Sequence, residues 1–114
     1  MLTDNQFQSL IKDLENAINF ELKGEFNRSR VIARQVAGKA IRLFVSQLKL
    51  FPVQSLTPYQ TLIDVQNFPE IIFPVKEDLI ALTTRVNVDF SFPENLNLTQ
   101  SAKNIINFVK NFKG

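Results

Sequence analysis

GEFNRSRVIARQVAGKAIRLFVSQL, residues 24–48, is the most informative segment of the chain because it interleaves charged side chains with an apolar helical repeat. On a helix that turns by about 100° per residue, its apolar side chains fill one broad arc. The main members of this arc are Phe26, Ile32, Ala33, Val36, Ala37, Ala40, Ile41, Leu43, Phe44 and Leu48. The segment contains no proline, so the pattern predicts a continuous helix over residues 26–49. An arc of this width indicates contact with more than one neighbouring element.

The opposite, narrower arc of this helix carries the basic residues Arg28, Arg34, Lys39 and Arg42. One interpretation is a positive stripe that binds the phosphates of a nucleotide or RNA, since arginine is suited to bidentate phosphate contacts. The other is a solvated or salt-bridged helix face, which we favour because no exposed aromatic residues or glycine loop accompany the charge. Gly38 lies in the same arc. It either admits the close approach of another backbone or is simply tolerated.

Arg30 differs from the other arginines because its angular position lies inside the apolar arc. A guanidinium there requires a carboxylate partner, since an unpaired buried charge is costly. Asp89, Glu21 and Asp78 are the candidates. We choose Asp89, which sits in an extended segment that must cross the bundle to deliver the last helix. The predicted structural ion pair is therefore Arg30 with Asp89.

Apolar spacing predicts further helices on both sides of this segment. The first ends at Gly24 and begins with Thr3 and Gln6 in a capping-box arrangement. Thr57 and Gln60 form a similar signal for a short helix through about residue 66, with Pro58 at its first position. A further helix is predicted from residue 74 to about 87, and a last one capped by Thr99.

Four phenylalanine–proline pairs, which begin at residues 51, 68, 73 and 92, divide the second half of the chain. The residue before a proline is driven toward extended geometry, so each pair predicts a helix boundary with an aromatic side chain tucked into the core. Together these patterns predict a single all-α domain over residues 1–114, an antiparallel bundle of four to five helices.

The composition excludes several chemistries. The chain has no histidine and no cysteine, so it lacks a Ser-His-Asp triad, a thiol nucleophile and a conventional zinc site. Its three glycines stand apart, which excludes a glycine-rich phosphate loop. We expect no catalytic residue, no metal and no cofactor. The first residues do not form a signal peptide, and no apolar run approaches the ~20 residues of a membrane span, so we expect a cytoplasmic protein without a membrane partner.

Two groups of residues also carry a family resemblance. The first is Gly24, Arg28, Arg30, Val31, Ala33, Arg34, Ala37, Gly38 and Ala40. The second is residues 82–90, LTTRVNVDF, followed by a proline and a short terminal helix. On these residues the chain resembles the HEPN-like superfamily, in a bacterial branch that lacks the Arg-x4-6-His ribonuclease motif. The resemblance covers most of the chain and is weakest over residues 50–75.

The resemblance implies an antiparallel helical bundle that commonly dimerises. Some members of the superfamily bind nucleotides beside a nucleotidyltransferase partner, and others are toxin ribonucleases. The absence of histidine removes the general acid and base that the ribonuclease activity requires. Proteins that share a fold can differ in function, so the resemblance predicts the helical fold more directly than it predicts a function.

The sequence therefore predicts a non-catalytic helical interaction or scaffold module that forms a homodimer and docks a protein partner. The breadth of the apolar arc in residues 26–49 supports the dimer. The alternative is a nucleotide- or RNA-binding module that uses Arg28, Arg34, Lys39 and Arg42. An enzyme acting through carboxylates is the third interpretation, and the sequence shows no constellation that supports it.

Overall fold

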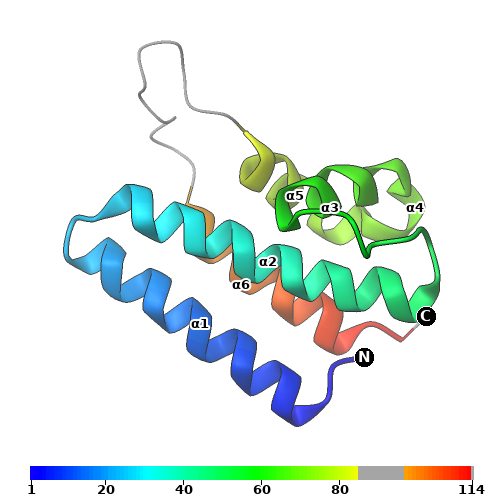
Figure 1. Ribbon diagram of the computed structural model, residues 1–114, viewed down its shortest axis with the longest axis horizontal. Helices are drawn as coiled ribbons and strands as arrows, with labels where there is room; N and C mark the ends of the chain where they lie inside the picture. Colours follow the sequence, from blue (N-terminus) through cyan, green and yellow to red (C-terminus); the bar gives the residue numbers. More distant parts are fainter. Residues whose placement is uncertain (85–96, 114) are drawn as a thin grey trace.

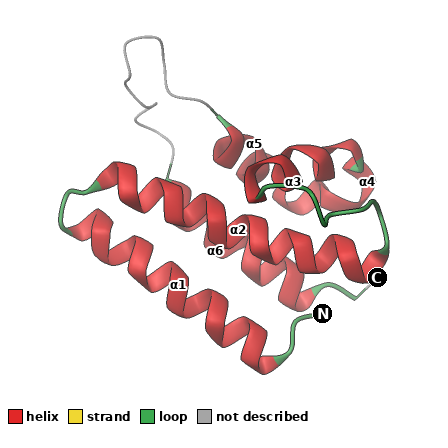
Figure 2. Cartoon of the chain, viewed as in Figure 1, coloured by secondary structure: helices red, strands yellow, loops and turns green. Residues whose placement is uncertain are grey.

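The computed structural model describes residues 1–84 and 97–113, and every regular element in these ranges is helical (Figures 1 and 2). The helices are α1 (Asp4–Leu22), α2 (Phe26–Leu48), α3 (Pro58–Asp64), α4 (Pro69–Ile72), α5 (Lys76–Thr83) and α6 (Leu98–Asn111). Short 3-10 turns follow α3 at Val65–Asn67 and join α4 to α5 at Phe73–Val75. The predicted all-α class is confirmed.

The three long helices lie side by side, and the short helices α3 to α5 cover the side of α2 and α6 away from α1 (Figure 1). The start of α1 meets the end of α6, where the Met1 ammonium donates to the Lys110 carbonyl at 3.0 Å. Helix α1 is therefore antiparallel to both α2 and α6. Helices α2 and α6 run in the same direction, which differs from the antiparallel expectation. The long connection through α3 to α5 allows this parallel return.

The two ends of α1 follow the sequence signals. Thr3 accepts a hydrogen bond from the Gln6 N–H at 3.1 Å, and the Gln6 side chain accepts one from the Thr3 N–H at 3.0 Å. The predicted capping box is confirmed. Gly24 has φ of 78°, a left-handed conformation that suits glycine and lets the chain reverse into α2.

Helix α2 is the centre of the bundle and packs against α1, α3, α5 and α6. The wide apolar arc is therefore covered largely within the chain itself. Gly38 is buried against the start of α3. A Cβ atom at Gly38 would lie 2.7 Å from the Pro58 Cα and 2.8 Å from the Pro58 carbonyl oxygen. The close-approach interpretation of Gly38 is confirmed.

The short helices depart further from prediction. The Thr57 side chain accepts from the Gln60 N–H at 3.1 Å, but the Gln60 side chain donates to Asp64 at 2.7 Å, so only half of the expected capping box forms. Phe51 and Phe68 stack at 5.7 Å between ring centroids, as expected of boundary aromatics. Phe73 does not pack into the core as predicted, and the residue is 76% exposed.

Helix α6 begins one residue before Thr99. The side chain of Asn97 accepts from the Gln100 N–H at 3.0 Å, so Asn97 is the N-cap and the prediction of Thr99 as the cap was wrong. The Thr99 hydroxyl instead contacts Glu21 Oε2 at 2.9 Å and joins α6 to α1. At its other end α6 packs Phe108 and Phe112 on the buried ring of Phe44, with centroids at 5.3 and 4.8 Å.

Candidate functional site

Arg34 has a structural role that the sequence did not indicate. Its half-buried guanidinium donates from Nε to the Leu82 carbonyl at 2.9 Å and from Nη2 to the Thr84 carbonyl at 3.0 Å. The Tyr59 hydroxyl donates to the Thr83 carbonyl at 2.9 Å. Three successive carbonyls at the end of α5 are thus satisfied by side chains of α2 and α3, and the arginine charge also suits the negative end of the helix.

Burial lowers the pKa of the Arg34 guanidinium from its usual range, and the positive charge of Arg30 acts in the same direction while Tyr59 opposes both. The guanidinium still carries its charge at neutral pH, because arginine titrates far above it. The Arg34 side chain therefore caps the C-terminal end of α5 and links that helix to α2.

The other basic residues of α2 make separate contacts. Arg28 pairs with Glu25 at 3.5 Å, and its guanidinium carbon lies 5.6 Å from the centre of the Phe20 ring. Lys39 pairs with Asp13 of α1 at 3.6 Å. Both ion pairs are well exposed and therefore contribute little to stability. The four residues do not form one stripe, since Arg34 faces α5 while Arg28 and Lys39 face α1.

Lys39 and Arg42 are the two members of the set that share a site. They line a groove of about 450 Å³ between the first turns of α1 and the middle of α2. Arg42 donates from Nη1 to the Leu56 carbonyl at 3.3 Å. The groove is completed by Asn5, Gln6, Ser9, Leu10 and Leu43. We call it the Lys39–Arg42 groove.

Arg30 lines a different pocket of about 270 Å³, beside Glu21 of α1 and Thr99 of α6. Its Nη1 atom donates to Asn27 Oδ1 at 3.4 Å, and its guanidinium carbon lies 5.9 Å from the centre of the Phe26 ring. The predicted partner Asp89 lies outside the described residues, so that ion pair stays a prediction. The second candidate, Glu21, is in the same pocket as Arg30.

Helices α1 and α2 expose an apolar surface near the turn that joins them. Val31 is 50% exposed and lies beside the half-buried Phe20 and Ile32. These side chains line a hollow of about 440 Å³ together with Asn27 and Arg28. We call these five residues the α1–α2 patch. Further large apolar side chains are exposed close to the same turn, at Ile18, Leu22 and Phe26.

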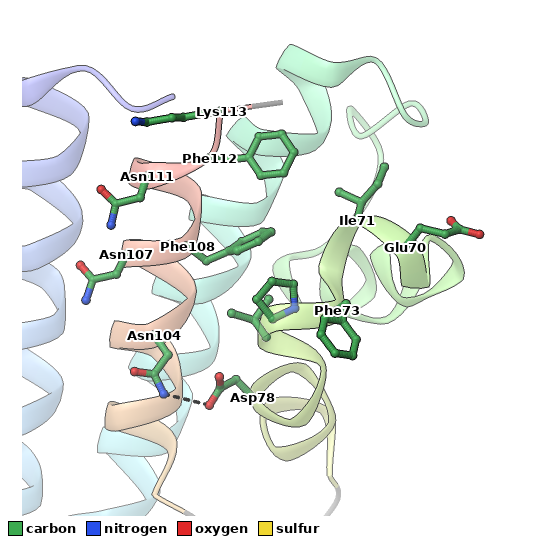
Figure 3. A pocket seen from close by; sticks show the side chains of 12 residues that line it. Glu70, Ile71, Phe73, Asp78, Asn104, Asn107, Phe108, Asn111, Phe112 and Lys113 are labelled. Atoms are coloured by element: carbon green, nitrogen blue, oxygen red, sulfur yellow. Dashed lines mark hydrogen bonds between the residues drawn. The ribbon is translucent and has the colours of Figure 1, made fainter.

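On the other side of the bundle a groove of about 630 Å³ separates α6 from the segment that contains α4 and α5 (Figure 3). We call it the α5–α6 groove. The α6 wall contains three amides and two rings, Asn104, Asn107, Asn111, Phe108 and Phe112, and Lys113 follows it. The facing wall includes Glu70, Ile71, Phe73 and Asp78.

The polar groups of the α5–α6 groove fall into two sets. Asn104 is fixed, since its Nδ2 donates to Asp78 Oδ1 at 3.2 Å and its Oδ1 accepts from Gln100 at 3.0 Å (Figure 3). Within the described ranges, no hydrogen bond engages the side chains of Asn107 and Asn111, which project from α6 on the side away from Glu70 and Phe73 (Figure 3). One hydrogen bond, from Asn104 to Asp78, therefore joins the two walls of the groove, and the other two amides can bond with a ligand.

Sequence reasoning missed the α5–α6 groove. Asn104, Asn107 and Asn111 recur at intervals of three and four residues, which places them on one helix face. That spacing was a usable signal. The Phe-Pro pattern predicts a core position for Phe73, and only the path of the chain places its ring at the rim of the groove.

In residues 1–84 and 97–113, no three side chains of the metal-binding types gather closely enough to hold an ion. None of the helices described combines the length and apolar character needed to cross a membrane. No family model, curated protein or solved structure matches the chain.

Proposed function

We propose that this protein is a non-catalytic helical interaction module that forms a homodimer through the α1–α2 patch and docks a protein partner elsewhere. The observation that carries the proposal is the exposure of Val31 at the edge of an apolar hollow. A half-exposed valine between Phe20 and Ile32 gives a second copy an apolar surface to cover.

Charge at the edge of the α1–α2 patch favours a second copy of the chain as the occupant. Glu25 and Arg28 are both exposed and pair at 3.5 Å, so this edge presents both signs of charge. A twofold axis brings the same patch of two protomers together, and a surface that carries both signs is then complementary to itself. The dimer supports the scaffold role, because it presents two copies of every other surface.

The dimer is tested by analytical ultracentrifugation of the wild-type chain and of Val31→Glu. We expect the substitution to weaken dimerisation by at least about tenfold, because each interface would then bury two uncompensated carboxylates. Gln35→Glu is the matched control, since Gln35 is exposed one turn further along α2 and the charge change is the same. A wild-type chain that stays monomeric at the highest concentration reached would contradict the dimer.

The second candidate function is the binding of a phosphate-bearing ligand in the Lys39–Arg42 groove. Two cations lie there beside the first turn of α1, where the positive end of the helix dipole favours an anion. The half-buried Leu43 offers an apolar surface for the rest of a nucleotide. Arg28 and Arg34 of the predicted stripe are outside the residues that line this groove.

The nucleotide alternative is tested by calorimetric titration with ATP at 50 and 200 mM salt. If this alternative holds, the affinity falls with salt, and Lys39→Gln weakens it by about fivefold at the lower salt concentration. Lys12→Gln removes the same charge from an exposed site outside the groove and serves as control. Absence of binding at 50 mM salt would eliminate the alternative.

A further inference from the structure

We propose that the α5–α6 groove binds an extended, basic segment of a partner protein through its main chain and its lysine or arginine side chains. The inference rests on the proposed role as an interaction module and names the chemistry of its partner. It uses a surface separate from the α1–α2 patch, so the two proposals can fail independently.

The charges of the groove determine the sign of the occupant. Glu70 and Asp78 stand on one wall, and within the described residues neither takes part in a salt bridge. Lys113 is the one cation among the residues that line the groove, which gives it a net negative charge in a chain whose formal net charge is +2. A cationic segment is therefore complementary to the groove, whereas two carboxylates repel the phosphates of a nucleic acid.

The amides on α6 indicate an extended conformation for that segment. Asn107 and Asn111 each offer a donor and an acceptor to the solvent, and Asn104 precedes them on the same face. From Asn104 to Asn111 the helix rises by about 10 Å, the length of about three residues of extended chain. An extended segment has free main-chain N–H and C=O groups that can bond with these amides, whereas a helix uses its own groups internally.

The aromatic and aliphatic residues of the groove indicate that the bound segment also carries apolar side chains. Phe73 is 76% exposed at the rim, and Ile71 and Phe108 lie half-buried beside it. A large aromatic ring left in water is a contact surface that binding can desolvate. A segment that carries both apolar and basic residues can therefore cover these rings while its cations reach Glu70 and Asp78.

The probe is a fluorescein-labelled hexapeptide, (Leu-Lys)3, titrated with the full chain and followed by fluorescence polarisation at 150 mM salt. We expect saturable binding below about 1 mM, loss of binding when glutamate replaces lysine in (Leu-Glu)3, and binding weakened by at least about fivefold when serine replaces leucine in (Ser-Lys)3. In a ¹⁵N-labelled sample, the side-chain amide signals of Asn107 and Asn111 should shift on addition of (Leu-Lys)3.

Two substitutions test whether (Leu-Lys)3 binds in the α5–α6 groove. Glu70→Lys should weaken the affinity for (Leu-Lys)3 by about tenfold, and Phe73→Ala by about fivefold. The matched controls are Glu77→Lys and Ile80→Ala, at exposed positions on α5 that do not line the groove. Both controls should bind as the wild type does. All four positions are exposed, so thermal melts should show that the variants fold.

Several outcomes would overturn the proposal. They are absence of saturable binding, equal affinity for (Leu-Glu)3, and equal weakening by Glu70→Lys and Glu77→Lys. A shift of the Asn107 and Asn111 signals by single-stranded oligouridylate would assign the groove to nucleic acid instead. Val31→Glu separates the two proposals, since a monomeric variant that still binds (Leu-Lys)3 supports the groove even where the dimer is disrupted.

Discussion

Arg34→Met is expected to lower the free energy of unfolding by about 3 kcal/mol, measured by urea denaturation. The substitution removes two charge-assisted hydrogen bonds, to the carbonyls of Leu82 and Thr84, and leaves both acceptors at a half-buried helix end. It also removes a positive charge that interacts favourably with the negative, C-terminal end of the α5 dipole. Methionine keeps much of the apolar length of arginine, so the lost packing is small.

Three further variants test this role for Arg34. Arg34→Lys keeps the charge but not the fork that reaches two carbonyls, so we expect a loss of about 1.5 kcal/mol. Tyr59→Phe removes the bond to the intervening Thr83 carbonyl and should cost about 1 kcal/mol. The double variant Arg34→Met, Tyr59→Phe measures the coupling between the two caps. Gln35→Met, at an exposed neighbour, is the control, and an equal loss in it and Arg34→Met would contradict the capping role.

Gly38→Ala is expected to destabilise the fold by about 2 kcal/mol, although alanine is the better helix former by about 1 kcal/mol. The added Cβ would lie 2.7 Å from the Pro58 Cα and 2.8 Å from its carbonyl oxygen. Both are backbone atoms, so no side-chain rotation relieves the overlap. The start of α3 must move away from α2, and the packing between these helices is lost. Thermal denaturation followed by circular dichroism measures the change.

Ser46→Ala is the matched control for Gly38→Ala. Ser46 is exposed near the end of α2, so alanine there changes the helix propensity without a steric contact. We expect an effect within about 0.5 kcal/mol. If Gly38→Ala were as stable as the wild type or more stable, the close approach of α3 to α2 would be contradicted.

Much of the fold follows from local signals that need no knowledge of neighbours. The capping box at Thr3 and the left-handed Gly24 depend on the backbone within one turn. The span of α2 follows from periodicity and the absence of proline. Thr99 shows the limit of such signals, because Asn97 offers the same cap two residues earlier and tertiary packing decides between them. The parallel course of α2 and α6 depends on the path of α3 to α5, which periodicity does not encode.

The candidate sites were less predictable for a related reason. Helical projection separates polar from apolar residues, but it does not say which element lies opposite each polar side chain. Projection therefore groups Arg34 with Arg28, although Arg34 caps α5 and Arg28 lies near the end of α1. The α5–α6 groove joins residues 70–78 to residues 104–113, and neither wall carries a recognisable motif by itself.

The contrast between α2 and the short elements has a consequence for hydrogen exchange. Amide protons in the middle of α2, which four other helices surround, should exchange with solvent only when the whole domain unfolds. Helix α4 and the turn Phe73–Val75 contain only a few internal hydrogen bonds, so their amides should exchange through small local openings. One wall of the α5–α6 groove is α6, which packs against α2, and the other contains these locally opening elements, whose backbone can adjust around an incoming chain.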